Sequence, residues 1–167
     1  QDAEELGRGL TRWSRYATEG WLIAGEAAAR QGFADRALAC YQAVPQDGSP
    51  LARTALLARG ELYLKALPAL GEAERVYREV LAAEPENLVA NERLAYVLGL
   101  QGRAGEAAVH RVNLLRQGRV LPLQLVLLAL GDTADENPET AAEVYQAHPD
   151  DIAACLAVAR IAAQREK

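Results

Sequence analysis

Methionine is absent from this sequence of 167 residues, and aromatic residues make up only 5% of it. A chain without methionine has no start residue of its own, so we expect a piece of a longer or processed protein, and a signal or anchor upstream of Gln1 stays open. The shortage of aromatic residues argues against a large aromatic core or a β-sandwich. Hydrophobic residues still make up 50% of the chain, with alanine and leucine dominant, which favours close contact between helices.

Cysteine and long hydrophobic runs are also scarce. Cys40 and Cys155 are the only cysteines and form no Cys-x-x-Cys motif, so we interpret them as small buried residues rather than a disulfide or metal site. The most apolar stretch, VLPLQLVLLAL at residues 120–130, is too short to span a bilayer and contains Pro122 and Gln124. We therefore predict no membrane contact for this part of the protein, and the start of the chain lacks the basic and apolar regions of a signal peptide.

The charge balance disfavours nucleic acid as a partner. The chain carries 18 basic and 23 acidic residues, a net charge of −5, whereas proteins that bind a phosphate backbone present clustered positive charge. We interpret the acidic excess first as a means of solubility and only second as an attraction for a basic ligand.

Residues that could carry catalysis are few and scattered. The only histidines, His110 and His148, lie outside any His-Glu-x-x-His motif, and we interpret His110 as a solvated residue on a charged helix face. Neither serine, Ser14 or Ser49, lies in a Gly-x-Ser-x-Gly turn. The acidic loop at residues 131–139 lacks the ligand alternation of a calcium-binding loop. We therefore predict no enzyme activity, no cofactor and no bound metal.

Alanine recurs along the chain with a regular period, each time four residues before a larger residue. The pairs are Ala37/Tyr41, Ala73/Tyr77, Ala107/Arg111 and Ala141/Tyr145, and the alanines lie 36, 34 and 34 residues apart. A second series of small residues precedes them, at Gly25, Gly60, Ala95 and Ala129, spaced by 35, 35 and 34. Two series in the same register indicate a repeated pair of helices.

Each period is consistent with two antiparallel helices joined by a tight turn. Glycine stands at the expected turn at Gly32 and Gly102, where a helix has to stop and reverse. Proline stands near the end of the second helix, at Pro45, Pro85 and Pro149. Because one helical hairpin cannot bury both of its faces, we expect successive hairpins to stack.

The small residues predict how each hairpin is packed. We expect Gly25 to meet Ala37 where the two helix axes approach, with the tyrosines filling the gap towards the next hairpin. Charged residues of the second helices, such as Glu74 and Arg78, are expected to form i,i+4 pairs on a solvated outer face.

These residues resemble the tetratricopeptide repeat, a 34-residue helical hairpin with small residues at its helix crossing, a glycine at its turn and a proline at its end. The matching positions are Trp21, Gly25, Ala37, Tyr41, Gly60, Ala73, Tyr77, Ala95, Ala107, Ala129, Ala141 and Tyr145. The third copy departs from the pattern because Arg111 replaces the aromatic residue, and the fourth copy is degenerate. An irregular helical bundle or a Sel1-like repeat with longer units is the alternative.

The resemblance covers residues 18–167 and implies an all-α fold, a right-handed α-α superhelix of about four helix-turn-helix units plus terminal helices. The predicted segments are an N-terminal helix at 1–17, four repeat units at 18–51, 52–87, 88–121 and 122–149, and a C-terminal helix at 150–167 that starts a fifth unit or caps the fourth.

The resemblance also implies a partner. In this family the first helices of successive units line a concave groove that binds an extended peptide or a helix of another protein. The corresponding positions are Leu22, Glu26, Ala29, Leu57, Glu61, Leu64, Glu92, Arg93, Tyr96, Val126, Leu130, Leu156 and Arg160. The family's clamp for chaperone C-termini needs lysine and asparagine at places where this chain has Leu22, Glu26, Ala58 and Val89, and only Arg93 fits it. We therefore expect a non-catalytic scaffold that binds a protein or peptide other than a chaperone tail.

Two further roles stay open. The ends of the solenoid could join a second copy, which would make the chain an assembly segment, or the chain could be a regulatory domain of a larger protein. Light scattering would separate the assembly role from the peptide-binding role, because a monomer at all concentrations would weaken the former. The absence of a signal segment favours a cytoplasmic location, with the upstream sequence deciding.

Overall fold

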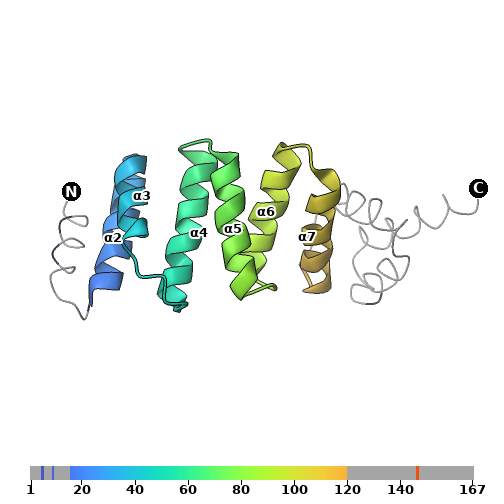
Figure 1. Ribbon diagram of the computed structural model, residues 1–167, viewed down its shortest axis with the longest axis horizontal. Helices are drawn as coiled ribbons and strands as arrows, with labels where there is room; N and C mark the ends of the chain where they lie inside the picture. The colour runs from blue at the N-terminus through green and yellow to red at the C-terminus, as the bar shows by residue number, and fades with distance from the viewer. Residues whose placement is uncertain (1–4, 6–8, 10–15, 120–145, 147–167) are drawn as a thin grey trace, which may run out of the picture. The chain divides into compact units, whose positions relative to one another are not determined.

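The computed structural model describes residues 5, 9, 16–119 and 146, and all regular structure in that part of the chain is helical (Figure 1). The predicted all-α class is therefore confirmed. The chain divides into two compact units, Gln1–Pro85 and Glu86–Lys167.

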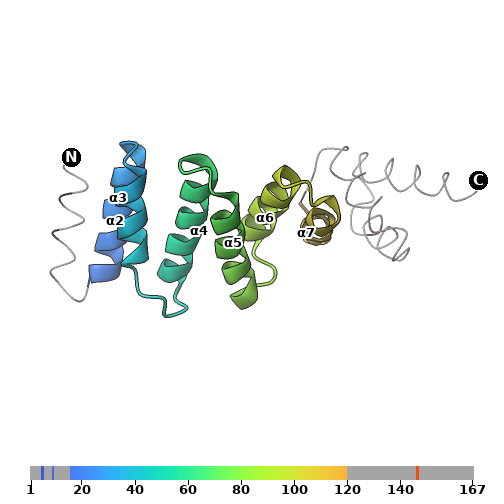
Figure 2. The same cartoon turned by 45° about the horizontal axis from the view of Figure 1, so that its top comes forward.

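The first unit contains two helical hairpins. The first hairpin is α2 (Ala17–Arg30) with α3 (Ala34–Gln42), and the second is α4 (Pro50–Lys65) with α5 (Leu70–Ala83). The α4 helix contacts both α3 and α2, so the two hairpins are stacked, as both views show (Figures 1 and 2). The second unit contains one described hairpin, α6 (Leu88–Leu100) with α7 (Ala104–Arg116).

Glycine in the left-handed conformation closes three of these helices. Gly32, Gly102 and Gly118 have φ of 81°, 75° and 81°. After α2 the Phe33 amide donates to the Ala28 carbonyl at 2.9 Å and the Gly32 amide donates to the Ala29 carbonyl at 3.0 Å. This bonding pattern satisfies carbonyls that the end of a helix leaves without partners. The two turn glycines that the sequence analysis singled out thus reverse the chain where expected.

Side-chain hydrogen bonds cap the N-termini of α4 and α6, the first helices of the second and third hairpins. The Ser49 hydroxyl accepts a hydrogen bond from the Ala52 amide at 3.2 Å, and Pro50 follows as the first residue of α4. The Asn87 side chain likewise accepts from the Ala90 amide at 3.0 Å at the start of α6. Pro85 lies two residues before this second cap and two residues after the end of α5, where we predicted a proline.

A buried cluster joins the stacked hairpins of the first unit. Its members are Ala28, Ala37, Tyr41, Val44, Ala55 and Leu62. Because Ala55 and Leu62 belong to α4, the cluster includes side chains of both hairpins, and Trp21 and Leu22 pack against it. Cys40 is also buried, as predicted, whereas Cys155 lies outside the described residues.

Close packing at the glycines of the first helices differs from the prediction. A Cβ atom placed on Gly25 would lie 2.6 Å from the Tyr41 Cε1 atom, and one on Gly60 would lie 2.6 Å from the Tyr77 ring. The tyrosine of each hairpin therefore lies across the glycine of its own first helix, whereas the sequence analysis placed the tyrosines towards the next hairpin. A ring on the neighbouring helix fills the space that the missing side chain of glycine leaves.

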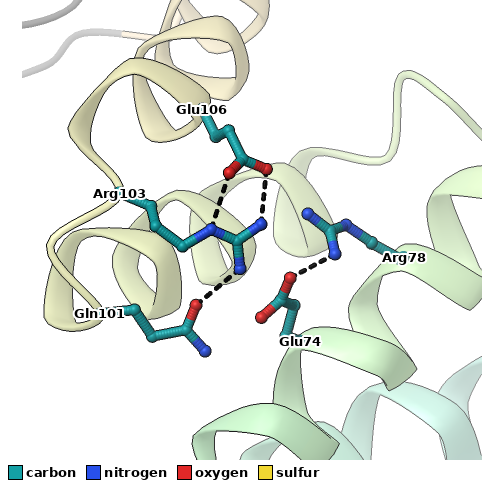
Figure 3. Close-up of polar contacts among 5 residues, drawn as sticks. All are labelled: Glu74, Arg78, Gln101, Arg103 and Glu106. Atoms are coloured by element: carbon teal, nitrogen blue, oxygen red, sulfur yellow. Dashed lines mark hydrogen bonds and ion pairs between the residues drawn. The ribbon is translucent and has the colours of Figure 1, made fainter.

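The Glu74 side chain also differs from the prediction. Glu74 forms the expected ion pair with Arg78 along α5, but Glu74 is only 8% exposed, so the pair does not lie wholly on a solvated outer face (Figure 3). Glu74 adjoins Ala73 and lies three residues before Tyr77, and both of these are completely buried. The buried arc of α5 is therefore wider than the single stripe that the apolar residues suggested, and it includes a carboxylate.

The core of the hairpin of the second unit combines leucine side chains with buried polar residues. Leu94, Leu98, Leu114 and Leu115 are fully buried. Arg111, which stands where the other hairpins have tyrosine, is 8% exposed, and a Cβ on Gly99 would lie 3.3 Å from its Nη2 atom. In the turn between the helices, the Arg103 guanidinium donates to both oxygens of Glu106 at 2.7 and 2.6 Å and to Gln101 at 2.9 Å (Figure 3).

His110 is not the solvated residue that we predicted. It is half-buried, and its Nδ1 atom lies 2.8 Å from the Asn91 Oδ1 atom on the facing helix. Asn91 is completely buried and donates from Nδ2 to the Asn87 carbonyl at 3.0 Å. Asn91 explains the error, because a buried amide needs partners and the histidine of the facing helix is one of them.

Several predicted features lie outside the described residues. These are the N-terminal segment up to residue 15, nearly all of the fourth unit at 122–149, the C-terminal helix at 150–167, and the repeat positions Ala129, Ala141 and Tyr145. His148 belongs to the same part of the chain.

Candidate protein-binding faces

The first helix of each hairpin carries the residues predicted to face a partner. In the first unit these are Leu22 and Glu26 on α2, and Leu57, Glu61 and Leu64 on α4. In the second unit they are Glu92, Arg93 and Tyr96 on α6. Val126, Leu130, Leu156 and Arg160 lie outside the described residues.

The predicted positions of the first unit combine exposed and packed side chains. Glu26 is exposed, whereas Leu22, Ala29, Leu57, Glu61 and Leu64 are half-buried. Leu22 and Ala29 pack against the buried cluster, so much of their surface serves the contact between hairpins. The α2 and α4 helices are in contact, so the predicted positions of this unit lie on neighbouring helices.

Glu61 is engaged in contacts that the sequence did not indicate. Its carboxylate accepts a hydrogen bond from the Tyr77 hydroxyl at 3.2 Å and pairs with the Lys65 ammonium at 2.5 Å. Tyr77 is completely buried, so its hydroxyl needs this acceptor. Glu61 therefore contributes to the packing of its own hairpin in addition to any contact with a partner.

Tyr41 and Glu26 are the counterparts of Tyr77 and Glu61 in the first hairpin. The pKa of Tyr41 is raised from 10.0 to about 12, mainly by burial of its side chain and to a smaller extent by the negative charge of Glu26. No ion pair or hydrogen bond of Glu26 is found among the residues that the structure describes.

The α6 helix presents an apolar stripe that the sequence analysis recognised only at Tyr96. Val89, Tyr96 and Leu100 are 47%, 54% and 53% exposed, and Leu88 at the start of the helix is 43% exposed. Their spacing of seven and four residues repeats on one side of a helix, while Ala90, Leu94, Val97 and Leu98 fill the opposite, buried side. The spacing of these residues is visible in the sequence, but it identifies an exposed stripe only when the buried side of the helix is known.

Two charged residues lie between Val89 and Tyr96, one on each side of this stripe. Glu92 is exposed and its carboxylate lies 3.7 Å from the Arg119 guanidinium, and Arg93 is half-buried. The face of α6 is thus an apolar strip with a carboxylate and a guanidinium in its middle. Apolar anchors with charges beside them are common at surfaces that bind other proteins.

The first unit also has a shallow depression on its surface. It has a volume of about 180 Å³ and lies between the start of α4 and the end of α5, with Ser49, Arg53 and Glu79 in its lining. Arg53 is already paired with Glu84 at 2.5 Å. The cation of the lining is therefore satisfied within the chain.

The described residues were also compared with what a metal site and a membrane-spanning helix require. Between residues 16 and 119 no group of three or more histidine, cysteine, aspartate or glutamate side chains is placed to hold a metal ion. In that same stretch, no helix combines the length and the apolar character that a membrane crossing requires.

Comparison with known proteins identifies no relative. The sequence matches no protein-family model, and no curated protein aligns with it significantly.

Proposed function

We propose that this chain is a tetratricopeptide-like module that binds an extended segment of another protein along the exposed sides of its first helices. It acts as a scaffold and has no catalytic role. In this proposal the helical hairpins continue into a right-handed superhelix, and the first helices supply its binding surface.

The exposed stripe on α6 is the observation that carries the proposal. Eight large apolar side chains are exposed among the described residues, and four of them, Leu88, Val89, Tyr96 and Leu100, belong to this one helix. Contiguous exposed apolar surface on a soluble domain commonly marks a contact with another protein. Tyr96 is the natural anchor, because a rigid aromatic residue gives a large contact area at small cost in conformational entropy.

The packing of the first unit supports the repeat character of the fold. Gly25 with Tyr41 and Gly60 with Tyr77 form the same close contact in consecutive hairpins. In addition, α4 packs against both helices of the preceding hairpin, which is the stacking that a helical-repeat protein requires.

The test is a selection of random peptides displayed on phage against the full chain, followed by affinity measurement on the selected peptides. The test variant combines Val89→Ala with Tyr96→Ala. The control combines Val109→Ala with Phe33→Ala, which removes a valine and an aromatic ring of similar exposure, 53% and 46%, outside the first helices. We expect the test variant to weaken binding at least about tenfold, because truncation of an aromatic anchor costs more than 1 kcal/mol.

Equal affinities for the two double variants would contradict a binding role for α6. Failure to select any peptide would contradict the proposal as a whole. Glu61 is unsuitable for this test, because Glu61→Lys would also remove the acceptor of the buried Tyr77 hydroxyl.

A further inference from the structure

Two successive hairpins of the first unit contain a tyrosine ring packed against a glycine that is followed by a glutamate. In the second hairpin Gly60 lies under the Tyr77 ring, and the next residue, Glu61, accepts from the Tyr77 hydroxyl. In the first hairpin Gly25 lies under the Tyr41 ring, and the next residue is Glu26. The described hairpin of the second unit has Ala95, Tyr96 and Arg111 at these places instead.

The two copies differ in what meets the carboxylate. Glu61 binds the ammonium of Lys65, one helical turn further along α4. The residue one turn beyond Glu26 is Arg30, and no ion pair joins Arg30 to Glu26. In the second hairpin a cation thus pairs with the carboxylate that follows the glycine, whereas the matching carboxylate of the first hairpin, Glu26, has no ion pair within the described part of the chain.

The surroundings of Glu26 are suited to a side chain from outside. Glu26 is exposed, and Ile23 and Leu22 lie three and four residues before it on the same side of α2. Ile23 is 37% exposed, so an apolar group can contact it without disturbing the core. A lysine or arginine complements this surface because its aliphatic stem can cover Ile23 while its charged group reaches the carboxylate.

We propose that Glu26 binds a lysine or arginine side chain in the extended protein segment that this module recognises. The inference rests on the proposed function and adds to it the chemistry of the partner: a basic residue with an apolar residue beside it. The site is on α2, in the first unit, and its residues are distinct from the apolar stripe of α6.

Peptides selected on the full chain test this assignment. We expect lysine and arginine to be enriched in them at one position, and we expect that enrichment to be lost when selection is repeated on Glu26→Gln. The matched control is Asp35→Asn, which removes one exposed carboxylate from the second helix of the same hairpin. The control is expected to keep the enrichment.

Affinity measurement on one selected peptide gives a second readout. Glu26→Gln is expected to weaken binding about fivefold, the upper range for an exposed ion pair, and the loss should shrink at high salt. Replacement of the peptide's arginine by neutral citrulline, or of its lysine by norleucine, should cause a similar loss in the wild-type chain and little further loss in Glu26→Gln. Such non-additivity identifies the two groups as partners.

The possible failures are separable. Selected peptides that lack a basic position, or whose affinity for Glu26→Gln is unchanged, overturn the role of Glu26, while the proposed function stands if the α6 variant still binds them more weakly. Additive losses in the cycle also overturn it. If no peptide is selected on the wild-type chain, both proposals fail.

Discussion

Replacing Gly60 by alanine is expected to destabilise the protein, although the same change stabilises most helices. Alanine in a helix interior is favoured over glycine by about 1 kcal/mol. At Gly60, however, the added Cβ would lie 2.6 Å from the Tyr77 Cε1 and Cζ atoms and 3.0 Å from its hydroxyl oxygen. Tyr77 is completely buried, so its ring has no solvent-filled space into which it could move.

Overpacking of this kind costs about 1–3 kcal/mol, and a Cβ 2.6 Å from a buried ring places the cost in the upper part of that range, above the gain of about 1 kcal/mol in helix propensity. We therefore expect Gly60→Ala to lower the free energy of unfolding by about 1–2 kcal/mol. Gly71→Ala is the matched control, because Gly71 lies on α5 of the same hairpin and a Cβ there would meet nothing within 4 Å. It is expected to be neutral or mildly stabilising.

Urea denaturation followed by circular dichroism measures both variants. Adding Tyr77→Leu to Gly60→Ala should cost less than the sum of the two single substitutions, because the smaller side chain relieves the contact. The reasoning is refuted if Gly60→Ala stabilises the protein as much as Gly71→Ala does.

The same structure supports two further predictions. The pKa of Tyr41 is 10.0 in the unfolded chain and about 12 in the folded protein, so the unfolded chain loses this proton first as the pH rises. The contribution of Tyr41 to the free energy of unfolding is therefore complete below pH 10 and decreases between pH 10 and pH 12. Tyr41→Phe should make that fall shallower in denaturation curves, and an unchanged profile would show that Tyr41 is not its source. Asn91→Ala should cost about 1–3 kcal/mol in the same assay, because it removes both the contact with His110 and the Nδ2 hydrogen bond to the Asn87 carbonyl, and His110→Ala should cost less because the Asn91 side chain then keeps the second of these bonds. Equal losses for the two would contradict this ranking.

The sequence predicted those features that depend on neighbours along the chain. Alanine and glycine at a fixed period predicted helices, and Gly32 and Gly102 predicted turns, because helix propensity and a left-handed turn are local properties. The position of Pro85 follows from the same local rules, and so do the caps at Ser49 and Asn87, although the sequence analysis did not predict them.

Features that depend on contacts between helices were predicted less well. Glu74 is polar, so nothing in its own segment indicates that it is buried, and His110 resembles a surface residue until Asn91 is placed opposite it. The apolar stripe of α6 was missed for the same reason. Val89 and Leu100 look like core residues in the sequence, and only the packing of Leu94 and Leu98 shows which side of the helix is left exposed.

The contact between glycine and tyrosine links two positions that lie 16 or 17 residues apart, Gly25 with Tyr41 and Gly60 with Tyr77. Neither residue of a pair can change alone without a clash or a cavity, so a viable sequence has to replace both together. The third hairpin has made such a joint replacement, with Ala95 and Arg111, and the longer arginine extends one helical turn further to Gly99. A single helix of this chain can therefore be exchanged for the matching helix of another hairpin in an engineered array only if its partner helix is exchanged with it.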